Sequence, residues 1–173
     1  MRVVQLILRA WEFVWTLLIM SLIGNMINQA FAGNPSSVNY TMFVSAFSMF
    51  SLFYLIPASW NLDWAIHPII MIIVDVLNTI FFFCAAIALA ARLHVHSCGN
   101  LAYTSTNEIT DGSFNSKKRC REAQASTAFL WFGWACYMAS TIISILMSRS
   151  ATVNMRGRTG SARRPARPSM AQV

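Results

Sequence analysis

The sequence is poor in charge: 11% of its 173 residues are charged, and six of these residues are acidic. Soluble domains carry about 25% charged residues, so this chain could not cover a water-facing surface of ordinary size. Hydrophobic residues make up 56% of the chain, and the mean hydropathy is +0.51. The composition excludes a soluble enzyme, a disordered tail protein and a disulfide-stapled secreted miniprotein, and it indicates an integral membrane protein.

The sequence also lacks the short motifs of catalysis. It has no Gly-rich phosphate loop, no Cys-x-x-Cys pair, no Gly-x-Ser-x-Gly elbow and no His-Glu-x-x-His. His94, His96 and Cys98 lie close together in sequence, but residues two apart do not converge on a helix. We therefore expect no enzymatic activity, no cofactor and no metal site.

Four apolar stretches are each close to the 20 or so residues that cross a bilayer as a helix. Spanning segments must be helical or form a closed barrel, and these stretches show no alternation typical of barrel strands. The sequence therefore predicts an all-α four-helix membrane bundle in residues 1–148, followed by a disordered basic tail in 149–173. The expected spans are about 11–31, 38–56, 66–91 and 123–147, with one long loop at 92–122.

Basic residues and cysteines both favour one orientation. Four spans place both termini on one side, which holds eight of the 13 basic residues, and the positive-inside rule makes this side cytoplasmic. Cys98 and Cys120 bracket the long loop, and a disulfide between them needs an oxidising, non-cytosolic compartment. Unpaired or palmitoylated loop cysteines are the alternative. We expect the disulfide, an extracellular loop and cytoplasmic termini.

Asp75 is the conspicuous polar residue of the predicted third span, and Asn78 follows it by one turn. An ionisable group inside a membrane span is costly and suggests a lipid-headgroup, ion or proton site. The structural alternative, which we favour, is a hydrogen-bonded clamp between helices. Three polar residues of the first span recur at helical spacing and are candidates to meet Asp75: Ser21, Asn25 and Asn28.

Two further patterns concern helix packing. Arg9 and Glu12 are three residues apart, within salt-bridge reach, and we expect them to form a pair at the membrane interface rather than a catalytic pair. Small residues also recur at helical spacing in the last two spans, where they allow helix backbones to approach closely. We expect these residues to pack within one bundle more than between subunits: Ala86, Ala90, Ser126, Gly133, Ser140 and Ser144.

The tail carries six arginines and no acid after the last apolar stretch. Each arginine would attract an anionic leaflet by about 1 kcal/mol, and a topology signal alone is the alternative. Thr159 and Ser161 follow arginine in contexts that basophilic kinases favour, so phosphorylation there would weaken the attraction. The six arginines are Arg149, Arg156, Arg158, Arg163, Arg164 and Arg167.

Several stretches together resemble the fungal non-classical export protein family, which are small four-span proteins of the MARVEL type. No single stretch is diagnostic, but their order and spacing are. The stretches are Ser37-Val38-Asn39-Tyr40, Met42-Phe43, Asp75-x-x-Asn78, His96-Ser97-Cys98, Asn107-x-Ile109-Thr110-x-Gly112-Ser113, Arg119-Cys120-Arg121-x-Ala123-Gln124-Ala125 and Ala128-Phe129-Leu130.

The resemblance implies a plasma-membrane organiser of sphingolipid- and sterol-rich microdomains, the furrow-like patches associated with eisosomes. It implies lipid sensing and a link to the export of proteins without signal peptides, and it supports the Cys98–Cys120 bridge. The expected partners are sphingolipid, sterol, anionic phospholipid, further copies of the chain and other microdomain proteins, with no nucleic acid. A small transporter or channel that uses Asp75 and Asn78 is the alternative function.

Overall fold

The computed structural model describes residues 2–31, 33–60, 68–94 and 96–161. These residues form five helices: α1 (Arg2–Asn28), α2 (Ser36–Trp60), α3 (Pro68–Leu93), the short α4 (Leu101–Thr104) and α5 (Ser116–Ser161). Four segments are long and apolar enough to cross a membrane: Val3–Asn28, Ser36–Trp60, Ile69–Leu93 and Ser116–Arg149. The prediction of an all-α protein with four spans is confirmed.

The ends of the helices differ from those expected. α1 begins at Arg2, and α5 begins at Ser116 and ends at Ser161. A hydropathy window follows apolar side chains, whereas backbone hydrogen bonding continues through polar residues that are not proline. Residues 149–161, which we expected to be disordered, continue α5, because they extend a helix that is already nucleated and contain no proline. Residues 162–173 lie outside the described part of the chain.

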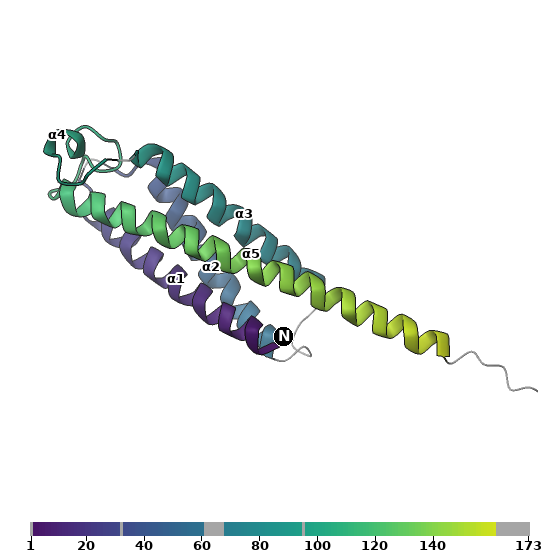
Figure 1. Cartoon of the computed structure of the whole chain (residues 1–173). Helices are drawn as coiled ribbons and strands as arrows, with labels where there is room; N and C mark the ends of the chain where they lie inside the picture. The colour runs from purple at the N-terminus through teal and green to yellow at the C-terminus, as the bar shows by residue number, and fades with distance from the viewer. Residues whose placement is uncertain (1, 32, 61–67, 95, 162–173) are drawn as a thin grey trace, which may run out of the picture.

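The long helices form a closed ring in which α1 packs on α2, α2 on α3, α3 on α5 and α5 on α1. Figure 1 shows the N-terminus at one end of this bundle, at which α5 also leaves it, and α4 with its loops at the other end. We call these the terminal end and the loop end. Because α1 and α3 run in the same direction, the first residues of both helices lie near the terminal end.

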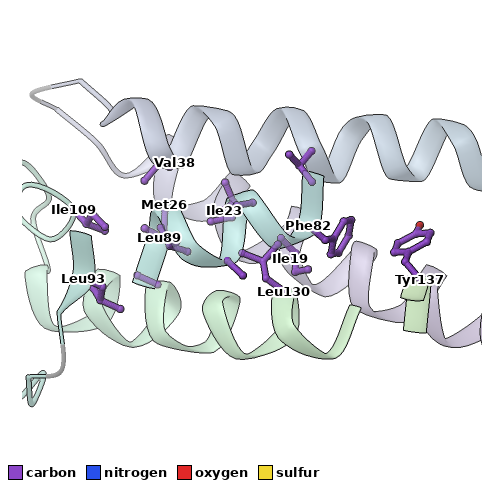
Figure 2. Packing of buried hydrophobic residues seen from close by; sticks show 14 residues of the cluster. Ile19, Ile23, Met26, Val38, Phe82, Leu89, Leu93, Ile109, Leu130 and Tyr137 are labelled. Atoms are coloured by element: carbon purple, nitrogen blue, oxygen red, sulfur yellow. The ribbon is translucent and has the colours of Figure 1, made fainter. Parts of the chain in front are cut away.

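The apolar core fills the part of the bundle nearer the loop end. Figure 2 shows its side chains, contributed by every long helix, with Tyr137 at the edge of the cluster. The fully buried members include Ile19, Ile23, Met26, Val38, Phe82, Leu89 and Leu130. This cluster leaves the terminal half of the interior to other side chains.

Gly133 allows α5 to approach α3 closely. A Cβ atom at this position would lie 2.5 Å from Cε1 of Phe82, so only glycine leaves room for the ring. Its neighbours in the predicted small-residue stripe also face inward, since Ala86, Ser126 and Ser140 are fully buried and Ala90 and Ser144 are half-buried. The structure thus places these small residues within one bundle.

Candidate functional site

Three ionisable side chains meet in the centre of the bundle near the terminal end. Arg9 forms two parallel hydrogen bonds to Asp75, Nη1 to Oδ1 and Nη2 to Oδ2, each 2.7 Å long. Nη1 of Arg9 also donates to Oε2 of Glu12 at 2.8 Å. All three residues are fully buried, and the Arg9–Asp75 bonds join α1 to α3 across the middle of the ring. We call this group the ion cluster.

The ion cluster corrects one expectation. Arg9 and Glu12 do not form an interfacial pair, because both are fully buried within a candidate span, Val3–Asn28. Because α1 begins at Arg2, Arg9 is about two turns inside the helix. The sequence does contain a signal for this arrangement: Gln5, Arg9, Glu12 and Thr16 recur at intervals of four, three and four, which places them on one face of a helix.

Hydroxyl groups of α5 complete the ion cluster. Oγ of Ser140 hydrogen-bonds Oε1 of Glu12, and Oγ of Ser144 donates to Oδ2 of Asp75 at 3.2 Å. Nε2 of Gln5 donates to Ser144, also at 3.2 Å, and Gln5 is 5% exposed. The two serines therefore serve as hydrogen-bonding groups as well as small packing residues.

A layer of neutral polar side chains lies next to the ion cluster, towards the loop end. Thr16 is 3.0 Å from Ser48, and Ser48 hydrogen-bonds the hydroxyl of Tyr137. Asn78 donates to Ser51 at 2.9 Å, so Asn78 ties α3 to α2 while Asp75 ties α3 to α1. The ion cluster and this layer together form a buried polar column, which ends at the apolar core.

The three predicted partners of Asp75 do not reach it. Asn25 donates to Glu122 at 2.5 Å, Ser21 bonds the carbonyl of Leu17 at 2.8 Å, and Asn28 is exposed. The reason is direction: α1 and α3 are parallel, so the start of α3 is level with the start of α1 and not with its end. The prediction that these residues meet Asp75 was wrong.

The comparisons with known proteins agree with this architecture. The family model of the MARVEL membrane-associating domain matches residues 2–143. Non-classical export protein 2 of Saccharomyces cerevisiae is 35% identical over 167 residues, which cover 89% of this chain and 90% of that protein. Non-classical export protein 102 of Candida albicans is 35% identical over 173 residues, covering 98% and 97%. A Schizosaccharomyces pombe homologue of non-classical export protein 2 is 28% identical over 149 residues, covering 86% and 80%.

The chain belongs to the fungal non-classical export protein 2 family of MARVEL proteins. The resemblance seen in its sequence is thereby confirmed. No solved structure matches the chain.

At the loop end of this MARVEL bundle, a disulfide joins Cys98 to Cys120, with their Cα atoms 5.7 Å apart. The bridge ties the start of the long loop to the second turn of α5. A backbone hydrogen bond of 3.0 Å from Phe31 to the carbonyl of Gly112 attaches the same loop to the α1–α2 turn, where Gly33 has a φ of 90°. The loop is therefore fixed to the bundle at two points.

The histidines near the disulfide line an open polar pocket with Arg92, Tyr103 and Glu108. The hydroxyl of Tyr103 donates to the carbonyl of Leu93, and burial raises the pKa of Tyr103, so this donor keeps its proton. Cys98 is disulfide-bonded and is not available to a metal. Within the described residues, no three His, Cys, Asp or Glu side chains are grouped to hold a metal ion.

The structure describes only part of the arginine tail of this MARVEL protein. Arg149 is exposed on α5. The same helix includes Arg156, Arg158, Thr159 and Ser161. Arg163, Arg164 and Arg167 lie outside the described residues.

Proposed function

We propose that the protein organises sphingolipid- and sterol-rich microdomains of the fungal plasma membrane, associated with eisosomes, and does so without enzymatic activity. The observation that carries the proposal is the polar column, which enters the bundle from the terminal end and ends at the apolar core. Its members form hydrogen bonds to one another across the helices, so they stabilise the bundle. The lipid-facing surface is then the part of the molecule that remains free to act.

The outer surface of the bundle suits that role. Large apolar side chains on all four long helices are exposed, and they would lie against lipid acyl chains in a bilayer. Phe50 and Phe53 of α2 are 78% and 68% exposed, more than most of the others. Because lipids and neighbouring proteins meet the chain through this surface, we take sphingolipid, sterol and further copies of the chain as its partners. Anionic phospholipid is the proposed partner of the tail.

The names of the relatives add a link to protein export. Because the yeast relatives carry the name of non-classical export, we propose that the organiser role includes support for export without signal peptides. Cytoplasmic termini and an extracellular disulfide-bonded loop complete the proposal, since basic residues favour the first and an oxidising compartment the second.

A transporter or channel that uses Asp75 and Asn78 is the competing function. Asp75 is bound on both carboxylate oxygens by Arg9, and Asn78 is bound to Ser51, so neither side chain is free to handle a substrate. A continuous path would also have to cross the apolar core around Ile19, Phe82 and Leu130. This arrangement favours the organiser.

The deciding experiment compares flux with lateral distribution. Wild-type protein and Asp75→Asn are reconstituted in liposomes, and ion and proton flux is measured. The same two proteins are imaged in the plasma membrane of a fungal strain that lacks the native gene. The organiser predicts no flux and patches that disperse when the protein is absent. Flux that depends on Asp75, with unchanged patches in the protein's absence, would establish the transporter instead.

A further inference from the structure

The charges of the ion cluster do not balance when all three groups are ionised. Glu12 and Asp75 would carry two negative charges against the single positive charge of Arg9, and no member is exposed. An unbalanced charge held away from water is strongly unfavourable, so the cluster favours binding one more positive charge. The guanidinium already lies between the two carboxyl groups and would repel a metal ion there. A proton carries the same charge and attaches to one oxygen.

The contacts of Ser140 identify the carboxyl group that binds this proton. Oγ of Ser140 contacts Oε1 of Glu12 and lies 3.1 Å from the carbonyl oxygen of Cys136. A hydroxyl has one hydrogen and cannot donate to both acceptors. If Glu12 is protonated on Oε1, it donates to Ser140, and Ser140 donates to Cys136. Both the Glu12–Ser140 contact and the Ser140–Cys136 contact are then hydrogen bonds with a donor and an acceptor.

Asp75 has the opposite environment. Both of its oxygens accept hydrogen bonds from Arg9, and Oδ2 accepts a further one from Ser144. Three donors and no neighbouring acceptor suit a carboxylate that keeps its charge. Arg9 and Asp75 thus form the ion pair, and Glu12 is the group that changes its protonation.

We propose that Glu12 is a proton-binding site that exchanges its proton with the terminal side of the membrane alone. Gln5 and Ser144 form a hydrogen-bonded chain from the slightly exposed terminal end to Asp75, and Arg9 bonds both Asp75 and Glu12, so the polar contacts of Glu12 lead to the terminal end. In the other direction, the hydrogen bonds of the polar column end at Tyr137. Among the described residues nearer the loop end, the fully buried hydroxyls of Thr41 and Ser45 bond carbonyls of their own helix, and that of Ser126 has no partner, so none of them continues the column. The site is therefore a sensor of one compartment and is not a transmembrane path.

The groups that surround Glu12 set its response to pH. Raising the pH on the terminal side removes the proton and leaves the ion cluster with a net negative charge, which loosens the packing of α1 against α5. The titratable and charged groups that face Glu12 are Arg9 on α1, Asp75 on α3, and Cys136 and Tyr137 on α5. From α2, the hydroxyl of Ser48, which does not titrate, bonds Tyr137.

Infrared spectroscopy of the full chain in lipid nanodiscs at neutral pH tests the assignment. A protonated carboxyl group has its own carbonyl stretch, which should be present in the wild type and absent from Glu12→Gln. Glu108→Gln is the matched control, because Glu108 is a solvent-exposed glutamate and its removal should leave the band unchanged. In Ser140→Ala the band should persist but shift, since the carboxyl group loses its acceptor.

A band that is unchanged in Glu12→Gln overturns the assignment to Glu12, and its loss from Asp75→Asn alone moves the proton to Asp75. Sidedness is tested in vesicles sorted for one orientation by an affinity tag on the N-terminus. Raising the pH on the tagged side should abolish the Glu12 band, and raising it on the loop side should not. An equal response from both sides overturns the one-sided site. Because this readout is spectroscopic, it can succeed or fail independently of the patches that test the organiser.

Discussion

The parallel hydrogen bonds between Arg9 and Asp75 are the contact on which the polar half of the bundle depends. Two charge-assisted bonds of 2.7 Å pair the two charges where both side chains are fully buried. A buried ion pair adds little net stability compared with apolar residues of the same shape, but the loss of one partner leaves the other charge buried and unpaired. Replacing either Arg9 or Asp75 alone should therefore lower stability far more than replacing both residues together.

For Asp75→Leu we expect a loss of about 3–5 kcal/mol in the free energy of unfolding, because Arg9 is left without its counterion. Asp75→Asn should lose less, since the amide oxygen still accepts from Arg9 and Glu12 can become the counterion. The double variant Arg9→Met/Asp75→Leu should regain most of the loss. Thermal unfolding in nanodiscs measures all three. Equal losses in the two single variants, with no recovery in the double one, would refute this account.

Gly133 offers a second test at the scale of one residue. Gly133→Ala should lower stability by about 1–3 kcal/mol, because the added methyl group would overlap the ring of Phe82. Gly24 is the matched control: nothing lies within 4 Å of a Cβ there, so Gly24→Ala should be neutral or gain up to about 1 kcal/mol in its helix. Recovery of Gly133→Ala by Phe82→Leu, measured by thermal unfolding, would identify the overlap as the cause.

At the scale of elements, the loop between α3 and α5 depends on its disulfide. Cys98 and Cys120 close a separation of 22 residues, and such a closure contributes about 3 kcal/mol. The double variant Cys98→Ser/Cys120→Ser should keep its four spans and become sensitive to protease between them. In the denatured wild type, thiol labelling followed by mass measurement should find two labels before reduction, on Cys84 and Cys136, and four after it. Four labels without reduction would contradict the bridge.

The C-terminal segment is the second element with a measurable property. A peptide of residues 149–173 should bind anionic vesicles and not neutral ones, and higher salt should weaken the binding steeply because its arginines attract by exposed charge. Thr159→Glu and Ser161→Glu should each reduce the affinity. A peptide with its arginines replaced by glutamine is the control. Binding that ignores salt or lipid charge would leave the arginines as topology signals alone.

The sequence predicts the elements of the bundle better than their ends. Long apolar runs identify all four spans, because the bilayer demands about 20 apolar residues from each helix. The start of α1 and the extent of α5 are missed, since hydropathy cannot register a helix that continues through Gln5 or past Arg149. Cys98 and Cys120 are paired as expected, and they bracket the long loop between α3 and α5.

At the scale of the whole molecule, the missed feature is the pairing of polar residues between helices. Asp75 is conspicuous in the sequence, but its partner could be named only from the relative direction and level of α1 and α3. Those two facts together place Arg9 opposite Asp75, and they exclude Asn25. The burial of Arg9 remained hidden because an arginine near the start of a span normally extends to the interface, and only a tertiary partner reverses that preference.

The distance in sequence between Arg9 and Asp75 has a consequence for the synthesis and membrane insertion of the protein. α1 emerges from the ribosome before α3, so it enters the bilayer with Arg9 and Glu12 but without the carboxylate that neutralises Arg9. Until α3 is inserted, these two side chains are more stable beside the lipid headgroups, because charged groups are costly in the hydrocarbon. The first helix must then sink or turn as the third arrives. Assembly of this bundle is therefore a late, cooperative step that follows insertion and is completed only when residues 66 positions apart have met.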